Sequence, residues 1–139
     1  MIAKNGILRS LQILMVDDQP DVSSLVAEVL VDEGAFVVPV NSGTSAISLF
    51  ALMKFDLVIL DLTMPQPDGF KVLEYIRATD PGLLRRTLVL TGQDLENPAI
   101  VKWTNRHITC LKKPFALDEL VEAAANMALP GVAPAYSID

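Results

Sequence analysis

Short, continuous apolar runs alternate with helical patterns along almost the whole chain, and this alternation restricts the fold more than any other feature. Four runs are strongly apolar and a fifth is weaker: Ile13–Val16, Phe36–Val38, Leu57–Leu60, Leu88–Leu90 and Ile108–Leu111. Because polar residues do not alternate with apolar ones inside these runs, they are typical of parallel strands that are covered on both faces. The sequence therefore predicts strands buried between two layers of helices.

The segments between the runs carry the spacing of amphipathic helices. Apolar residues recur three and four positions apart in four groups: Val22, Leu25, Val26, Val29 and Leu30; Ala46, Leu49, Phe50 and Met53; Phe70, Leu73 and Ile76; Leu117, Leu120, Val121 and Ala124. Gly34 follows the first group as a helix C-cap, and Asn97-Pro98 is typical of an N-cap followed by proline. These signals predict five β/α units.

Five such units predict an α/β fold with a doubly wound, five-stranded parallel sheet, right-handed crossovers and helices on both faces. Pro39 lacks a backbone donor, so we expect the second strand at an edge of the sheet. The polar fifth run suits the opposite edge, which gives the flavodoxin-like strand order 2-1-3-4-5. We expect one domain at residues 11–129, after an N-terminal extension (1–10) and before a C-terminal tail or linker (130–139).

Composition limits the functions that are open to the chain. With 51% hydrophobic residues among 139, it can bury a full core, but its apolar runs are far shorter than the ~20 residues that span a bilayer. The start, Met1–Ser10, has no signal-peptide pattern, so we expect a soluble, cytoplasmic protein. The only cysteine, Cys110, excludes an internal disulfide and a Cys-based zinc cluster. A formal charge of −6 argues against direct nucleic-acid binding.

Polar side chains stand at the carboxyl ends of four predicted strands, where open α/β sheets bind their ligands. Asp17-Asp18 end the first strand, Asp61 the third, Thr91 the fourth and Lys112-Lys113 the fifth. In the predicted order these strands are neighbours, so the side chains converge on one rim. Three carboxylates there need a cation, because two unit charges ~4 Å apart repel by roughly 4 kcal/mol at an effective dielectric constant of 20.

The ligand types favour Mg²⁺, which takes one or two carboxylates, keeps waters and shares oxygens with a phosphate. Thr91 adds a hydroxyl group and a lysine adds a positive charge, both suited to holding an anion beside the metal. In such a site Asp61 would attack phosphorus as the nucleophile. Neighbours at a strand end point to opposite sides, so only one of Lys112 and Lys113 can face it.

Together these segments resemble the receiver domains of response regulators in two-component signalling. The motifs are Val16-Asp17-Asp18, the acceptor loop Asp61–Gly69, Leu90-Thr91-Gly92 and Lys112–Phe115. Each motif alone is weak, but all four in order at matching strand ends are specific, and the resemblance spans about Leu11 to Met127. It implies a domain that accepts a phosphoryl group from a partner's phosphohistidine and then changes conformation.

The resemblance also implies a role for each acidic position. Asp61 would be the phosphoacceptor, and Asp18 together with Asp61 would ligate Mg²⁺ directly. Asp17 would act mainly through metal-bound water. The backbone carbonyl of Thr63 would be the third protein ligand.

The remaining motif residues would bind the phosphoryl group. Thr91 would hydrogen-bond it, with Gly92 leaving room for it to enter, and Lys113 would pair with Asp61 or with the phosphoryl group. The Lys113–Pro114 peptide bond is expected to be cis, as in the family. One position departs from the family pattern, because Cys110 stands three residues before the lysine, where Tyr or Phe is frequent.

Partners follow from the same resemblance. A sensor histidine kinase or a histidine phosphotransfer protein would donate the phosphoryl group, and an output domain or a downstream protein would receive the signal. A phosphorylation-dependent dimer fits this picture, whereas contact with nucleic acid or a membrane does not. The chain would be a phosphoacceptor signalling domain rather than an enzyme, although it would catalyse its own phosphotransfer and autodephosphorylation.

Three other interpretations fit the sequence less well. A haloacid-dehalogenase-type enzyme also forms an aspartyl-phosphate with Mg²⁺, but its nucleophile lies on the first strand and a second Asp follows two residues later, where this chain has Thr63. A degenerate receiver that only docks to partners would not need the complete set of acidic, Thr and Lys residues. A nucleotide-binding fold would show a G-x-G-x-x-G or G-x-x-x-x-G-K-[ST] pattern, and neither is present. Trp103 and His107 each occur once; Trp103 is interpreted as a packing or partner-surface residue, and His107 as a surface residue near a helix end.

Overall fold

Strands and helices alternate through the computed structural model, which describes residues 6–64 and 68–128. The elements are β1 (Gln12–Val16), α1 (Pro20–Asp32), β2 (Phe36–Val40), α2 (Gly43–Phe50), β3 (Leu57–Asp61), α3 (Asp68–Thr79), the 3-10 helix η1 (Pro81–Arg86), β4 (Thr87–Thr91), α4 (Pro98–Thr104), β5 (Thr109–Lys112) and α5 (Leu117–Ala128). The predicted tail at 130–139, half of the predicted N-terminal extension and residues 65–67 of the acceptor loop lie outside the described residues.

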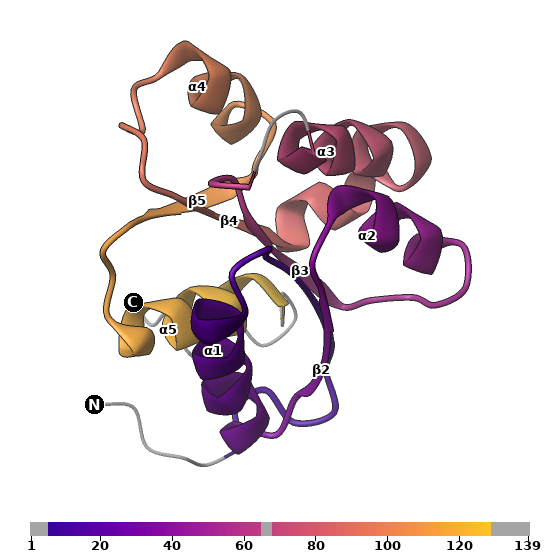
Figure 1. Ribbon diagram of the computed structural model, residues 1–139, viewed down its shortest axis with the longest axis vertical. Helices are drawn as coiled ribbons and strands as arrows, with labels where there is room; N and C mark the ends of the chain where they lie inside the picture. Colours follow the sequence, from indigo (N-terminus) through magenta and orange to yellow (C-terminus); the bar gives the residue numbers. More distant parts are fainter. Residues whose placement is uncertain (1–5, 65–67, 129–139) are drawn as a thin grey trace.

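All five strands are parallel, and their order is β2-β1-β3-β4-β5, so the predicted fold class is confirmed. Helices α1 and α5 cover one face of the sheet, and α2, α3 and α4 cover the other (Figure 1). Consecutive strand residues enter opposite cores because side chains alternate across a strand. Leu14 and Val16 pack on the side of α2 to α4, whereas Ile13 and Met15 pack on the side of α1 and α5. None of the described helices is long and apolar enough to cross a membrane.

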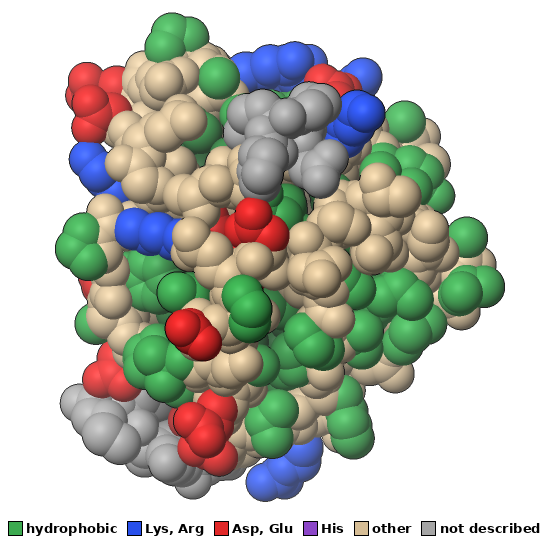
Figure 2. All heavy atoms as spheres, in the orientation of Figure 1, with side chains coloured by type: hydrophobic (Ala, Val, Ile, Leu, Met, Phe, Trp, Pro, Cys, Tyr) green, Lys and Arg blue, Asp and Glu red, His purple; other side chains and the backbone are tan. Residues whose placement is uncertain are grey.

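Strand β2 forms one edge of the sheet, as the position of Pro39 predicts. The Phe36 N–H donates to the Leu11 carbonyl, and the Val40 carbonyl accepts from the Asp17 N–H. Because the backbone groups of alternate residues point to opposite sides of a strand, Pro39 faces the open edge, where its missing N–H costs no ladder bond. Phe36 is 64% exposed, and hydrophobic side chains gather over the side where β2 and α2 lie (Figure 2).

Residues 6–10, the described part of the predicted N-terminal extension, are packed against the rest of the structure. Leu8 is fully buried against the core under α1 and α5. The Leu8 N–H donates to the Glu33 carbonyl at 3.0 Å, and the Ser10 N–H donates to the Gly34 carbonyl at 3.0 Å. Gly34 follows the end of α1 with φ +100°, so the predicted C-cap is confirmed.

Replacing Gly34 should destabilise the fold, because an alanine Cβ would lie 2.9 Å from the Arg9 Cα and the φ of +100° strains any L side chain. We expect Gly34→Ala to lower the free energy of unfolding by about 2 kcal/mol or more, measured by urea denaturation. Gly82→Ala is the control, since its Cβ would meet nothing closer than Asp80 Oδ1 at 3.8 Å. Equal stability of the two variants would contradict this account of the α1–β2 connection.

Candidate functional site

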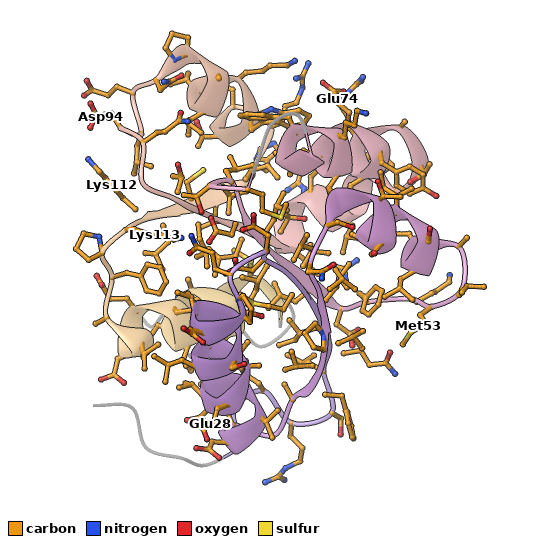
Figure 3. All side chains as sticks on the ribbon, in the orientation of Figure 1. Glu28, Met53, Glu74, Asp94, Lys112 and Lys113 are labelled. Carbon is orange, nitrogen blue, oxygen red and sulfur yellow. The ribbon has the colours of Figure 1, made fainter. Side chains whose placement is uncertain are left out.

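The two lysines at the end of β5 point in different directions, as the alternation along a strand requires. Lys112 Nζ donates to Asp94 Oδ1 at 2.8 Å in an exposed ion pair (Figure 3). Lys113 Nζ instead donates to Asp61 Oδ2 at 2.5 Å. The Lys113 N–H donates to the Thr91 carbonyl at 2.7 Å, and the Lys113–Pro114 peptide bond is cis, as the family resemblance predicts.

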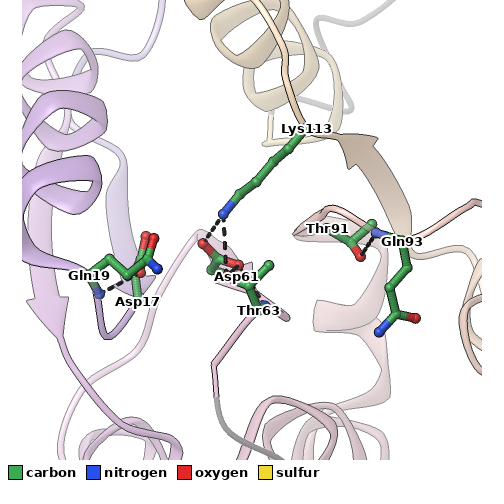
Figure 4. A network of polar contacts seen from close by, with 7 residues as sticks. All are labelled: Asp17, Gln19, Asp61, Thr63, Thr91, Gln93 and Lys113. Carbon is green, nitrogen blue, oxygen red and sulfur yellow. Dashed lines mark hydrogen bonds and ion pairs between the residues drawn. The ribbon is translucent and has the colours of Figure 1, made fainter.

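Asp61 lies at the carboxyl end of the central strand β3 and is fully buried. Both of its side-chain oxygens accept hydrogen bonds (Figure 4). Oδ2 accepts from the Lys113 ammonium group, while Oδ1 accepts from the Thr63 N–H at 2.8 Å and from the Thr63 hydroxyl at 2.6 Å. Lys113 Nζ is also 3.4 Å from the Thr63 hydroxyl oxygen. The structure therefore holds this carboxylate in one orientation from two sides.

Asp17 is the second buried carboxylate at this rim, with 2% of its surface exposed. Its Oδ1 accepts from the Gln19 N–H at 2.8 Å, but among the described residues its buried Oδ2 has no hydrogen-bond partner. Burial is the largest effect and raises the pKa of Asp17 to about 6; the Gln19 N–H opposes this shift, and the negative charge of Asp61 adds to it. Asp18, by contrast, is exposed.

Thr91 ends β4 and is buried, with 1% of its surface exposed. Its hydroxyl oxygen accepts from the Gln93 N–H at 3.0 Å, which leaves the hydroxyl proton available to an acceptor in the site. An added Cβ at Gly92 would meet no atom within 4 Å, so the space beside this residue is open. Thr91 thus ends the strand next to the one that Asp61 ends, at the same edge of the sheet.

Two contacts at the rim escaped the prediction from sequence. Only the backbone carbonyl of Thr63 was expected to act, whereas its hydroxyl and N–H both hold Asp61. The Gln19 N–H likewise fixes Asp17. The signal that could have found them is the spacing of two residues, because Asp side chains often accept from backbone N–H groups two positions further on.

The donor set fits a hard divalent cation, although the part of the chain that the structure describes has no group of three or more His, Cys, Asp or Glu side chains arranged around a metal. Mg²⁺ does not need such a group, because it often takes only one or two carboxylates and keeps several waters. The buried, unpartnered Oδ2 of Asp17 and the raised pKa of this residue mark a place where positive charge would be favourable.

Residues 13–125 match the protein family described as "Response regulator receiver domain". This chain belongs to that family. The receiver is 33% identical over 111 residues to the transcriptional regulatory protein TrcR of Mycobacterium tuberculosis, a match that covers 80% of this chain and 42% of TrcR. It is 31% identical to an uncharacterised 14.6 kDa protein of Leptolyngbya boryana, covering 83% of this chain and 90% of that protein. The receiver thus spans less than half the length of TrcR.

Solved structures agree with this assignment. The receiver domain of the Francisella response regulator 1452 matches with a TM-score of 0.77 at 20% identity, covering 88% of this chain and 99% of that one, and shows the same fold. The response regulator protein TrrA from Thermotoga maritima, in complex with Mg(2+)-BeF, matches with a TM-score of 0.73 at 30% identity, covering 84% and 98% of the two chains.

The raised pKa of Asp17 should make the metal-free receiver less stable as the pH rises. Because the pKa lies above its ordinary value of 3.8, the contribution of Asp17 to stability is complete below pH 3.8 and is lost as the pH rises through about 6. We expect Asp17→Asn, which keeps the acceptor for Gln19, to be more stable than wild type by about 2 kcal/mol at pH 8 and by much less at pH 4. Urea denaturation with EDTA across this range measures the difference, and a pH-independent difference would contradict the prediction.

Proposed function

We propose that this receiver accepts a phosphoryl group on Asp61 from the phosphohistidine of a sensor histidine kinase or a histidine phosphotransfer protein, in a Mg²⁺-dependent reaction. The observation that carries the proposal is the buried Asp61 carboxylate, which lies at the open rim of the sheet beside the Lys113 ammonium group and the Thr63 hydroxyl. We place the reaction in the cytoplasm and in the domain at residues 11–129.

In this reaction an Asp61 oxygen attacks phosphorus, the new O–P bond forms as the N–P bond to the donor imidazole breaks, and the released imidazole nitrogen takes up a proton. Lys113 already contacts Asp61 Oδ2, so its charge is in place to stabilise the phosphoryl oxygens. The Thr91 hydroxyl donates a hydrogen bond to one of them while its oxygen still accepts from the Gln93 N–H. Autodephosphorylation would end the signal: water attacks the same phosphorus, the O–P bond to Asp61 breaks, and inorganic phosphate leaves while the free carboxylate is restored.

The residues that would hold Mg²⁺ are Asp18 and Asp61 directly, the backbone carbonyl of Thr63, and Asp17 through water. When bound, the ion would offset the repulsion between the carboxylates and the incoming phosphoryl group. The buried Oδ2 of Asp17 supports a cation at this rim. A receiver that only docks to partners would have no use for this set, so we favour phosphorylation over that alternative.

We also propose how the signal reaches an output domain or a downstream protein. Cys110 is partly buried and packs against the core that contains Trp103 and Ile100 of α4. A cysteine is too small to fill the space that an aromatic residue takes at this position in other receivers. The parts that move are therefore helix α4 and the loop after Thr91. Two contacts connect this loop to the sheet: the Gln93 N–H donates to the Thr91 hydroxyl at the end of β4, and Asp94 pairs with Lys112 of β5.

Asp61→Asn should abolish phosphorylation, because it keeps the shape of the side chain and removes the nucleophile. Intact-mass spectrometry after incubation with acetyl phosphate and Mg²⁺ should show a labile gain of one phosphoryl group in wild type and none in the variant. Asp94→Asn is the matched control, because Asp94 is an exposed carboxylate whose pair with Lys112 lies away from Asp61. Equal labelling of wild type and Asp61→Asn would place the acceptor elsewhere.

Asp18→Asn should weaken Mg²⁺ binding about tenfold or more, since few carboxylates are available to replace the water that Mg²⁺ holds tightly. Asp18 is exposed, so the change should leave the fold intact. The test is a Mg²⁺ titration that is monitored through the NMR chemical shifts of the backbone amides around Asp61. Glu28→Gln removes an exposed charge near the far end of α1 (Figure 3) and should bind Mg²⁺ as wild type does. An unchanged affinity in Asp18→Asn would move the metal site away from this residue.

A further inference from the structure

A cavity lies at the opposite end of the sheet from Asp61, at the amino ends of β3 and β4. It has a volume of about 560 Å³ and is lined by the end of α2, the α2–β3 connection, the end of α3 and η1. This volume is within the range of small-molecule sites in proteins. None of the residues discussed above as acceptor, metal or phosphoryl ligands lines it. The cavity therefore has no part in the proposed phosphorylation.

Aromatic side chains form one wall of this cavity. Phe50 stacks on Tyr75 with ring centroids 5.7 Å apart and an interplanar angle of 20°, and it meets Phe55 edge to face at 6.0 Å and 88°. The cavity thus gathers three of the eight aromatic residues in the chain. Met53 and Leu83 extend the apolar lining. Such a wall favours a planar, unsaturated ligand, because aromatic rings gain from stacked and edge-to-face contacts beyond the area that they bury.

Hydrogen bonds to the backbone hold two of the polar side chains that line the cavity, Arg86 and Asp56. Arg86 Nη1 donates to the Asp56 backbone carbonyl at 2.8 Å, which holds a half-buried guanidinium group at the cavity. The Asp56 carboxylate accepts from the Gln12 N–H at 2.8 Å, so part of its acceptor capacity is used by the backbone of β1. Lys54 adds a second cation, and the only other carboxylate in the lining is Asp80, which is exposed.

We propose that this cavity, formed by the aromatic wall Phe50, Phe55 and Tyr75 and the cations Arg86 and Lys54, binds a planar aromatic carboxylate. The ring would lie along the aromatic wall, and the carboxylate would face the guanidinium group, whose remaining N–H donors suit a planar anion. Such a ligand would contact α2, α3 and η1 together. It would give the receiver a small-molecule input that is separate from Asp61.

The test uses 2-naphthoate as a probe, with 2-naphthamide as its uncharged counterpart and cyclohexanecarboxylate as a non-aromatic anion. In ¹⁵N NMR titrations of the full chain, 2-naphthoate should shift the amides of the cavity lining saturably, with a dissociation constant of about 1 mM or below for a ligand of this size. The other two compounds should bind about tenfold more weakly, because each lacks one of the two interactions.

Variants locate the site. Arg86→Gln should weaken 2-naphthoate binding about tenfold or more, and Tyr75→Leu should weaken it as well, whereas Arg85→Gln should not. Arg85 is the matched control, an exposed arginine next to Arg86 on η1 that does not line the cavity. Lys54→Gln, at an exposed position, tests the second cation without touching the bond between Arg86 and Asp56.

Two kinds of result would overturn the proposal. One is the absence of saturable shifts at the cavity lining with 2-naphthoate up to about 5 mM, several times the expected constant. The other is equal binding of 2-naphthoate and 2-naphthamide, or equal affinity in Arg86→Gln and wild type, which would show that the cations do not recognise the anion. Neither result bears on phosphorylation of Asp61, which the titration does not involve.

Discussion

The contact between Lys113 and Asp61 is the constraint around which the rest of the site is arranged. A fully buried carboxylate is costly without partners, and Asp61 sits at the end of the central strand with no exposed surface. The ammonium group that offsets this cost comes from β5, two strands away, so β3, β4 and β5 must stay in register for the pair to form. The hydrogen bond from the Lys113 N–H to the Thr91 carbonyl also fixes the end of β4 beside Lys113. Sheet geometry and site electrostatics therefore depend on each other.

The sequence predicts the fold well because its signals are local and repeated. Continuous apolar runs mark all five strands, but only β1, β3 and β4 are largely buried, whereas the edge strands β2 and β5 are not. Gly34, Pro39 and Asn97 mark a helix end, a sheet edge and a helix start, each of which the structure confirms. Features that rest on side chains meeting across the fold were not predictable in this way. Helix η1 begins with Pro81-Gly82, which resembles a loop in sequence. Leu8 is buried in the core in a segment whose backbone is held by two bonds, from the Leu8 N–H to the Glu33 carbonyl and from the Ser10 N–H to the Gly34 carbonyl.

The site residues divide in the same way, into those that local sequence signals locate and those that depend on contacts across the fold. Parallel strands bring their carboxyl ends to one rim, and this rule led to the contact between Asp61 and Lys113 that the structure shows, whereas Lys112 pairs with Asp94. Which of two adjacent carboxylates is buried could not be deduced from the sequence, because Asp17 and Asp18 differ only in which way each points from the strand. The hydroxyl bond from Thr63 to Asp61 and the stacking of Phe50 on Tyr75 depend on rotamers and on helix packing, for which the sequence carries no periodic signal.

The orientation of Pro39 also affects how the receiver behaves at high concentration. A strand edge with unpaired N–H and C=O groups is a template on which another chain can add a strand, and this is a common start of aggregation. At the β2 edge the proline removes one of the outward donors, so an incoming strand would find an interrupted ladder beside the exposed Phe36. The exposed, apolar edge strand β2 is thus a poor template for pairing with a second copy of the same strand.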